Sequence, residues 1–216
     1  MFILNEQNTI ANQFLAELRD INLQKDRARF RRNLERLGEI MAYEVSKGFS
    51  YSSLSIQTPL MQTEVKIPTE HPVLIAVLRA AFPFYQGFLN IFDQSDSGFA
   101  GAYRKEADNK QEDLEIEFLY QATPSLENRT IIVVDPMLAT GKSFIKTIQN
   151  LKRHGIPKMV HVVSVIASPE GVAYINQNLD IPFKIWTCAL DQGLNEKYYI
   201  LPGLGDAGDL CFGEKL

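Results

Sequence analysis

The sequence predicts an α/β protein in which a parallel sheet is flanked by helices. Apolar runs at 131–134, 160–167 and 183–188 indicate strands. The first run is four consecutive β-branched residues, which is typical of a strand buried on both faces. Helical patterns at 143–154 and 170–177 separate the three runs. Strands that alternate with helices in this way favour right-handed parallel connections within one sheet.

The N-terminal part of the chain predicts two helices. Residues 9–47 are rich in helix formers and contain no proline, and their apolar side chains recur at helical spacing in two groups joined near 20–24. We expect these helices to form an arm over residues 1–57. The arm carries more apolar surface than a peripheral helix pair needs, which favours a homodimer or a higher homo-oligomer.

The α/β core is expected over residues 58–188. It starts with a strand at 73–78, followed by a helix at 82–92 that has a proline in its first turn, where proline is tolerated. Two further strands are expected at 99–103 and 114–120, joined by an exposed excursion.

The C-terminal residues 189–216 form a separate segment, which we call the hood. Glycines and a proline are frequent in its stretch 199–208, so we expect irregular backbone that can approach a flat ligand closely. The length suits a single domain over residues 1–216 that contains the arm, the core and the hood.

Composition and charge exclude several classes of function. The 22 Lys and Arg residues against 26 Asp and Glu give a formal net charge of -4, so no basic field would draw the protein onto nucleic acid. The longest apolar stretch, 72–84, is interrupted by Arg79 and is shorter than the ~20 residues that a membrane span requires. The N-terminus lacks a secretion signal, and two cysteines suit a reducing compartment. We therefore expect a cytoplasmic protein with no nucleic-acid or membrane partner.

The segment from Asp135 to Ser143 lies between a buried strand and a helix, where parallel sheets bind ligands. Its small residues, Gly141 and two hydroxyls let backbone N–H groups converge on a phosphate at the helix N-terminus. Asp135 lies at the strand tip, where it can accept hydrogen bonds from sugar hydroxyls or face a metal-bound ligand. The sequence therefore predicts a phosphate-binding loop.

A P-loop is a rival interpretation of the same segment, because Gly141-Lys142-Ser143 has the form of a P-loop end. The P-loop pattern requires a glycine five residues before Gly141, and the residue there is Pro136. Proline removes both the flexible turn and an N–H group. A nucleoside triphosphatase is therefore disfavoured.

The run Asp135 to Ser143 resembles the phosphoribosyl pyrophosphate loop of type I phosphoribosyltransferases, and Asp-Pro-Met-Leu-Ala-Thr-Gly is similar to the form found in uracil phosphoribosyltransferases. The similarity covers nearly the whole chain, from about residue 19 to residue 213. Other segments resemble the same family in the same order: Tyr43-Glu44, Thr58-Pro59-Leu60, Leu78-Arg79-Ala80, Tyr103-Arg104, Ser168-Pro169-Glu170-Gly171, residues 190–196 and residues 202–209.

The resemblance implies a reaction in which uracil N1 displaces pyrophosphate from C1 of phosphoribosyl pyrophosphate, giving UMP. The protein would hold two anionic ends and a neutral base in line and stabilise the leaving group. The resemblance also implies Mg²⁺ bound mainly through the pyrophosphate of the substrate, with no separate metal site of the protein. Uracil and phosphoribosyl pyrophosphate are the implied partners, and GTP is a candidate effector.

The resemblance also implies the residues of the site. Asp135, Arg104 and Asp206 would be catalytic. Uracil would be contacted by Ile200, Gly205, Asp206 and Ala207, through backbone groups that match its alternating carbonyl and N–H edge. Phosphoribosyl pyrophosphate would be bound by Arg79, Arg104, Asp135, Pro136, Met137, Leu138, Ala139, Thr140, Gly141, Lys142, Ser143 and Asp206.

Two departures from the family pattern stand out. Lys142 replaces the second glycine of the usual Gly-Gly-Ser, and Ala81-Phe82-Pro83 replaces the usual Gly-Leu-Gly. The long side chain at 142 is expected to point away from the phosphate. A Cβ at position 81 is expected to restrict the pyrophosphate loop.

Two alternatives to the uracil enzyme stay open at this point. One is a regulator or inactive paralogue that senses pyrimidine nucleotides without turnover. Asp135, Arg79, Arg104 and Asp206 together disfavour it, because a binder of UMP has little need of pyrophosphate contacts. The other is a phosphoribosyltransferase that acts on another base.

Overall fold

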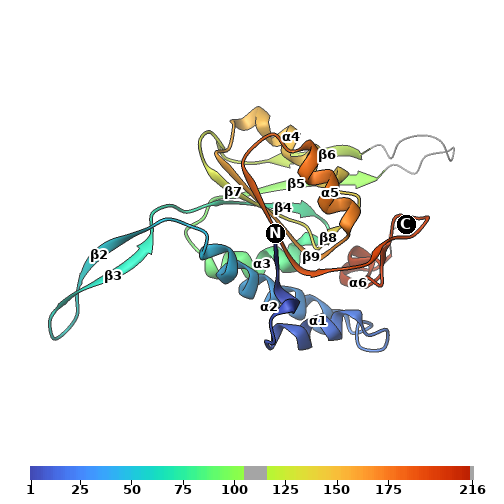
Figure 1. The fold of residues 1–216 in the computed structure, drawn as a ribbon, viewed down its shortest axis with the longest axis horizontal. Coiled ribbons are helices and arrows are strands. Elements are labelled where there is room, and N and C mark those ends of the chain that lie inside the picture. The colour runs from blue at the N-terminus through green and yellow to red at the C-terminus, as the bar shows by residue number, and fades with distance from the viewer. Residues whose placement is uncertain (105–115, 215–216) are drawn as a thin grey trace.

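The computed structural model describes residues 1–104 and 116–214, and its centre is a mostly parallel sheet (Figure 1). The strands of this sheet are β1 (Phe2–Ile3), β4 (Val73–Leu78), β5 (Ser97–Arg104), β6 (Ile116–Ala122), β7 (Thr130–Val134), β8 (Met137–Leu138), β9 (Met159–Ala167) and β10 (Phe183–Leu190). Within the described residues the strand order is β1-β10-β9-β7-β4-β5-β6, and β8 pairs with β9. Only the pairing of β5 with β6 is antiparallel among these described strands. The predicted fold class is confirmed.

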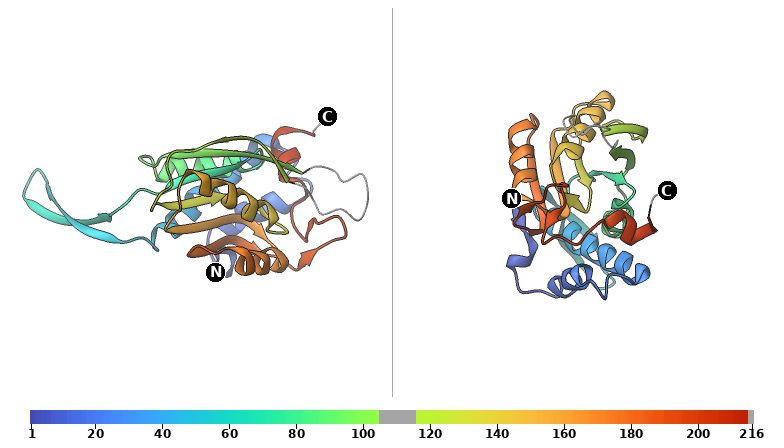
Figure 2. Two further views of the ribbon diagram at one scale, coloured as in Figure 1. Left: turned by 90° about the horizontal axis from the view of Figure 1, so that it is seen from above. Right: turned by 90° about the vertical axis from the view of Figure 1, so that its right-hand side faces the viewer.

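Helices cover both faces of the sheet, which makes three layers (Figures 1 and 2). The helices are α1 (Ala11–Arg19), α2 (Arg27–Ser46), α3 (Ala81–Ile91), α4 (Lys142–Leu151), α5 (Pro169–Asn178) and α6 (Ala207–Phe212), with 3-10 turns at Leu4–Glu6 and Lys152–His154. Alternate residues of each strand serve different layers. In β4, Leu74 and Ala76 pack with α1, α2 and α3, whereas Val73, Ile75 and Val77 pack with α4 and α5.

The two N-terminal helices are part of one of these layers. Leu18, Phe30, Leu34 and Leu37 are fully or almost fully buried in the same core cluster as the sheet residues. The expected pair of helices is confirmed, and these four side chains are covered within the chain itself. The expected oligomer therefore does not follow from them and stays a prediction.

Helices α1 and α2 are joined by a buried carboxylate. Glu17 accepts hydrogen bonds from Arg29 Nε at 2.8 Å, from Arg29 Nη2 at 2.7 Å and from Asn33 Nδ2 at 2.7 Å. These donors, Arg29 first and Asn33 second, lower the pKa of Glu17 from 4.5 to about 2. The carboxylate is therefore charged over the physiological pH range and holds α1 on α2.

Helices α2 and α3 approach each other through paired glycines. A Cβ on Gly38 would lie 2.1 Å from the carbonyl oxygen of Phe84, and a Cβ on Gly87 would lie 2.2 Å from the carbonyl oxygen of Glu35. No side chain fits at either position, so the two backbones are in direct contact.

A two-stranded hairpin projects from the body of the molecule (Figure 1). Its strands are β2 (Tyr51–Gln57) and β3 (Gln62–Pro68), and all their residues are exposed except the half-buried Pro68. Sequence reasoning missed this hairpin and set a boundary between arm and core inside it, after residue 57. Strand prediction relies on burial of one face, and here the chain itself buries neither face.

The hood contains more regular structure than expected. β11 (Gly193–Leu194) pairs antiparallel with β12 (Ile200–Leu201), and α6 begins at Ala207 with Asp206 as its N-cap. The expectation that 199–208 is irregular throughout was therefore wrong at both ends. The glycines remain in the turn between them, where Gly203 has φ +60° and Gly205 has φ +90°.

Within 1–104 and 116–214, no helix has both the length and the apolar character needed to cross a membrane.

Candidate active site

The candidate site lies where β4 and β7 end. These strands are parallel neighbours, so Arg79, directly after β4, and Asp135, directly after β7, lie at the same edge of the sheet. The predicted loop and the N-terminus of α4 follow Asp135. Ligands of open parallel sheets bind at this carboxyl edge.

The first part of the predicted phosphate loop is fixed to the sheet. Asp135 Oδ1 accepts the N–H of Met137 at 3.0 Å, and the carbonyl oxygen of Pro136 accepts the N–H groups of Val165 and Ile166. Met137 and Leu138 form β8, and the side chain of Leu138 is buried in the core. The connection between β8 and α4 is therefore the short stretch Ala139, Thr140 and Gly141. The assignment of Asp135 to Ser143 to phosphoribosyl pyrophosphate stays a prediction.

The second part of the loop leads into α4. Gly141 is the N-cap, with φ +75°, and Thr140 Oγ1 accepts the N–H of Lys142, the first residue of α4, at 3.4 Å. A positive φ favours glycine, and a Cβ at this position would lie 2.8 Å from the carbonyl oxygen of Gly171. The first N–H groups of any α-helix have no partner within the helix. Those of Ser143 and Phe144 can therefore bind a phosphate together with the helix dipole.

Ser168 and Gly171 support this loop from the next strand connection, and sequence reasoning gave them no role. Ser168 Oγ donates to the carbonyl oxygen of Ala139 at 2.6 Å and accepts the N–H of Gly171 at 2.9 Å. A Cβ on Gly171 would lie 2.3 Å from the same Ala139 oxygen. The signal was a serine N-cap directly after a buried strand, with a glycine three residues later.

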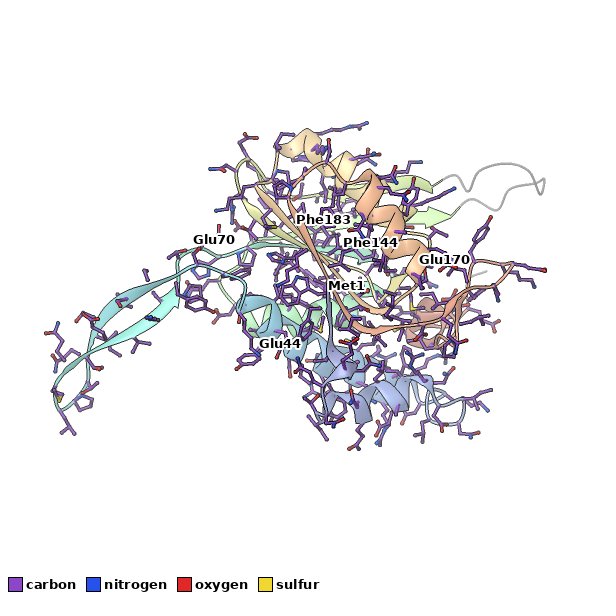
Figure 3. The ribbon with its side chains drawn as sticks, in the orientation of Figure 1. Met1, Glu44, Glu70, Phe144, Glu170 and Phe183 are labelled. Atoms are coloured by element: carbon purple, nitrogen blue, oxygen red, sulfur yellow. The ribbon has the colours of Figure 1, made fainter. Side chains whose placement is uncertain are left out.

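Glu170 connects the same segment to the hood. Its Oε1 accepts the N–H of Leu194 at 3.2 Å, across from α5 to β11. Figure 3 shows Glu170 at the end of α5 that faces the hood. One short segment, Ser168-Pro169-Glu170-Gly171, thus contacts both the phosphate loop and the hood.

Arg79 extends from the end of β4 toward the hood. Its Nη2 lies 3.4 Å from Asp209 Oδ1, and its side chain is 41% exposed. A buried arginine would be costly to desolvate, but this one is not buried. A Cβ on Gly208 would lie 3.2 Å from Asp206 Oδ1 and 3.6 Å from Arg79 Nη2. Arg79 and Asp206 therefore both approach Gly208. Both residues are exposed, so their polar ends are accessible.

Arg104 is the last residue of β5, the strand beside β4. Its backbone thus ends at the same edge of the sheet, and its side chain lies outside the described part of the structure.

The residues expected to contact uracil lie along the turn between β12 and α6. Ile200 and Ala207 are buried, whereas Gly205 and Asp206 are exposed. Asp206 Oδ1 accepts the N–H of Asp209 at 3.0 Å, which starts α6. The turn presents backbone groups between two buried anchors.

Comparisons with known proteins establish the family of the chain. A family model described as uracil phosphoribosyltransferase matches residues 5–214. The chain belongs to the uracil phosphoribosyltransferase family. A curated uracil phosphoribosyltransferase of Porphyromonas gingivalis is 44% identical over 213 residues, which are 99% of this chain and 98% of the relative. One of Pyrococcus furiosus is 39% identical over 97% of this chain and 88% of the relative.

Solved structures include a similar protein of Aquifex aeolicus. It superposes with a TM-score of 0.85 at 27% sequence identity, and the match covers 99% of this chain and 98% of that chain. The fold over the full length of the chain is therefore one found in a solved structure.

The departure from the uracil phosphoribosyltransferase family pattern at 81–83 is accommodated at the start of α3. Ala81 is fully buried in the core, and Pro83 is buried in the first turn, where its missing N–H has no helical partner to lose. Phe82 is 48% exposed. The expectation that the Cβ of Ala81 restricts the pyrophosphate loop stays a prediction.

Among the described residues, neither a cluster of metal-ligating side chains nor the cysteines form a second reactive centre. In the described part of the chain, no three His, Cys, Asp or Glu side chains cluster as a metal site would require. Both cysteines are buried free thiols, and burial raises the pKa of Cys188 and that of Cys211, the latter to about 12. Thiols with raised pKa values are poor nucleophiles, so neither cysteine competes with the edge of the sheet as a reactive site.

Proposed function

We propose that the protein transfers the 5-phosphoribosyl group of phosphoribosyl pyrophosphate to uracil. The bond from C1 to the pyrophosphate oxygen breaks, a bond from C1 to uracil N1 forms, and the proton of N1 is released, giving UMP and pyrophosphate. The observation that carries the proposal is the convergence, at one edge of the sheet, of a phosphate loop, an arginine and a glycine-containing turn. The protein is an enzyme of the pentosyltransferase class.

The phosphate end of the substrate is assigned to the loop and to α4. The N–H groups at the start of α4 bind the 5-phosphate, and Gly141 allows the backbone to turn toward it. Asp135 accepts hydrogen bonds from the ribose hydroxyls, while its Oδ1 already holds the N–H of Met137. Its negative charge also stabilises the positive charge that develops at C1.

The pyrophosphate end is assigned to Arg79, Arg104 and Asp206. Arg79 is exposed at the edge of the sheet and can bind pyrophosphate oxygens. When Mg²⁺ is bound, it would supply positive charge that neutralises the leaving pyrophosphate. Its preference for oxygen ligands suits the exposed carboxylate of Asp206, with the substrate supplying the other ligands.

Uracil is assigned to the turn between Ile200 and Ala207. Backbone N–H and C=O groups match the donors and acceptors of one uracil edge. Cytosine places a donor where uracil has an acceptor, which would leave buried polar groups unpaired, so it is rejected.

The test is an incubation with phosphoribosyl pyrophosphate, Mg²⁺ and one of five bases: uracil, cytosine, hypoxanthine, adenine or orotate. Nucleotide formed from uracil alone supports the proposal. Comparable turnover of hypoxanthine would leave the fold standing and assign a different base. If no base reacts but UMP binds, the protein is a pyrimidine-nucleotide sensor or an inactive paralogue.

We also propose that the protein is a homodimer or a higher homo-oligomer, and that the hairpin β2–β3 contacts a second copy. Its strand register places Leu54 opposite Val65, with Ile56 and Ile67 on the same face. All four are more than a third exposed. Ser53, Ser55, Lys66 and Glu64 occupy the other face. A projecting ribbon with one apolar face requires a cover that its own chain does not provide.

The oligomer is tested by light scattering on two variants. Leu54→Lys should shift the mass toward the monomer, because it places a charge on the apolar face. Ser55→Lys adds the same charge to the polar face and should leave the mass unchanged. A parent protein that is monomeric at high concentration would contradict the proposal.

Two further proposals, an effector and a cellular location, do not depend on the geometry of the site. GTP is proposed as an effector from the family resemblance alone, and it should raise the initial rate when added at fixed substrate concentrations. The cytoplasm is the proposed location, because both cysteines are free thiols.

A further inference from the structure

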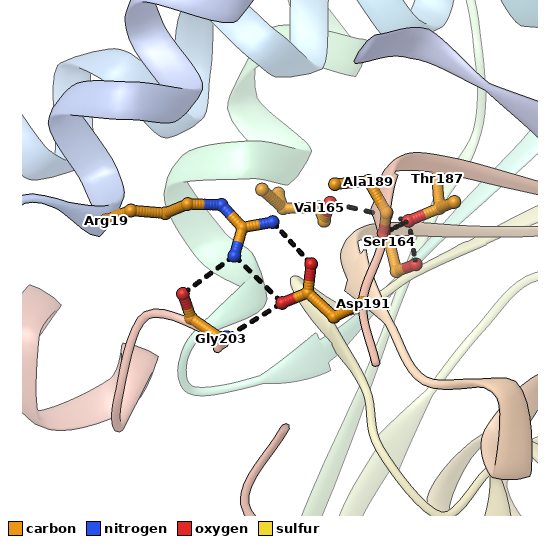
Figure 4. Close-up of polar contacts among 7 residues, drawn as sticks. All are labelled: Arg19, Ser164, Val165, Thr187, Ala189, Asp191 and Gly203. Carbon is orange, nitrogen blue, oxygen red and sulfur yellow. Dashed lines mark hydrogen bonds and ion pairs between the residues drawn. The ribbon is translucent and has the colours of Figure 1, made fainter. Parts of the chain in front are cut away.

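A partly buried ion pair between α1 and the start of the hood binds the backbone of one residue, Gly203 (Figure 4). Arg19, the last residue of α1, donates from Nη1 to Asp191 Oδ2 at 2.8 Å and from Nη2 to Asp191 Oδ1 at 2.6 Å. Asp191 directly follows β10, and only 5% of its side chain is exposed. Its own N–H donates to the carbonyl oxygen of Ala167 at 2.8 Å, which fixes it to the end of β9.

Both polar groups of Gly203 are bound by this pair. The N–H of Gly203 donates to Asp191 Oδ2 at 2.8 Å, and its carbonyl oxygen accepts from Arg19 Nη1 at 2.9 Å. Gln24, in the connection after α1, adds a long contact of 3.4 Å to the carbonyl oxygen of Leu204. The backbone of the turn is therefore held from α1 and from β10 together.

Gly203 lies between the residues assigned to uracil. Ile200 precedes it, Gly205 to Ala207 follow it, and a Cβ on Gly203 would lie only 2.2 Å from the carbonyl oxygen of Ile200. Because no side chain fits between Gly203 and this carbonyl, a shift of Gly203 toward it displaces the backbone of Ile200. A base recognised by backbone groups is sensitive to such a shift, since those groups have no rotamers with which to adjust.

We propose that Arg19 and Asp191 are positioning residues that set the affinity for uracil without contacting it. The proposal rests on the function proposed above. Desolvating an ion pair is costly, and apolar replacements are often at least as stable. Here the pair binds both the N–H and the carbonyl oxygen of one buried residue, Gly203, and an apolar contact could not orient those two groups.

The experiment compares three variants by steady-state kinetics. Asp191→Asn removes the charge and leaves an amide group that cannot accept from Arg19 at both positions. It should raise the KM for uracil by about 10-fold or more, the loss expected for a charge-assisted hydrogen bond. The KM for phosphoribosyl pyrophosphate and kcat should change by less than about 3-fold. Arg19→Lys keeps the charge but loses the two-pronged contact, and should give a smaller rise in the uracil KM.

Arg29→Gln is the matched control. It breaks the other ion pair of α1, the contact with Glu17, without touching Gly203. It should lower the thermal midpoint while leaving the uracil KM within about 2-fold. If it raises the uracil KM as much as Asp191→Asn does, general loosening of α1 explains the effect and the proposal is wrong.

Hydrogen exchange gives a readout that does not depend on turnover. The amide of Gly203 should exchange faster in Asp191→Asn than in the parent, while amides of β9 stay protected. An unchanged uracil KM, or an unchanged Gly203 amide, overturns the inference, and Arg19→Lys supplies the same test if Asp191→Asn fails to fold. A parent protein that makes no UMP refutes the proposed function instead.

Discussion

The phosphate loop and the hood are held in place in different ways. The carbonyl oxygens of Pro136, Leu138 and Ala139 are bound by residues 165–168, in the strand that follows α4 and in its extension. Gly203 in the hood is bound partly by Arg19, which is 184 residues away in the sequence. The proposed phosphate site is therefore supported within one strand-helix-strand unit, whereas the proposed base site depends on contacts between distant parts of the chain.

The difference follows the chemistry of the two ligands. A phosphate carries charge and is bound by a helix dipole and by N–H groups that tolerate small changes of angle. A neutral base is distinguished only by where donors and acceptors lie along its edge. The proposed base site thus needs the more rigid support, which is the role that we propose for the paired side chains of Arg19 and Asp191.

The largest expected effect is on the phosphate side, at Asp135. Asp135→Asn keeps the shape and an acceptor for the N–H of Met137 but removes the charge. If Asp135 stabilises the positive charge at C1, kcat should fall by roughly 10- to 1000-fold, as for the loss of one electrostatic contact. Single-turnover kinetics would measure this directly. An unchanged kcat would show that the carboxylate serves only the turn.

Gly171 tests whether the two regions are independent. In Gly171→Ala the added Cβ would approach the carbonyl oxygen of Ala139 to 2.3 Å, so the loop backbone must shift. The KM for phosphoribosyl pyrophosphate should rise by about 10-fold, within the usual cost of overpacking. The KM for uracil should change much less.

Gly48→Ala is the control for this change, since its Cβ would meet nothing closer than 3.3 Å. An equal rise of the KM for phosphoribosyl pyrophosphate and the KM for uracil in Gly171→Ala would contradict the independence of the loop and the hood. It would indicate that the contact from Glu170 to Leu194 couples the loop to the hood.

A smaller effect is expected at Lys142, the first residue of α4. If the loop binds phosphate through backbone groups, Lys142→Gly should change the KM for phosphoribosyl pyrophosphate by no more than a few-fold. A lysine that bound the phosphate would instead cost about 10- to 150-fold in affinity on removal. Steady-state kinetics separates these ranges, and ATP hydrolysis by the parent protein would revive the P-loop interpretation.

The smallest effect on either site is expected from His161, near the start of β9. Its Nδ1 accepts from Trp186 Nε1 at 2.9 Å, and burial, aided by the charge of Lys184, lowers its pKa from 6.5 to about 4. Between these two values the unfolded chain binds a proton that the folded chain does not. The contribution of neutral His161 to the free energy of unfolding is therefore fully present above pH 6.5. As the pH is lowered from 6.5 to about 4, this contribution is lost at about 1.4 kcal/mol per pH unit, or about 3 kcal/mol in total.

Urea denaturation from pH 7.5 to 4 measures this loss, with His161→Gln as the reference for all other titrating groups. The parent should lose more stability than His161→Gln over the same range. Parallel curves would show that His161 does not cause the loss. His161→Gln should leave both KM values unchanged, which separates global stability from the positioning of either site.

The elements that could be predicted from the sequence are those whose side chains are themselves apolar and therefore indicate a buried strand. The runs 73–78, 131–134 and 160–167 were expected within a residue of the observed strands, because β-branched side chains with no polar face have one compatible environment in a parallel sheet. The position of the phosphate loop followed from the same runs, since a loop directly after a buried strand must lie at the carboxyl edge.

The features that were missed depend on distant partners. Arg19 and Asp191 carry no local signal of their contact, because 172 residues separate them in the sequence. The hairpin β2–β3 was missed because neither of its faces is buried by its own chain, and Thr58-Pro59 was taken as the start of the core although it lies at the tip. The extent of α6 was missed because glycines dominate the residues before it.

The contact between Gly38 and Gly87 has a consequence for motion. Two helices whose backbones touch have no flexible side chains between them to absorb sliding, so α2 and α3 move as one rigid body. Arg79 lies two residues before the start of α3, and α2 also carries α1 through Glu17 and Arg29. The pyrophosphate contact and the support of the base site thus share a single mechanical frame. Any movement of the proposed site during turnover would therefore involve segments outside this frame.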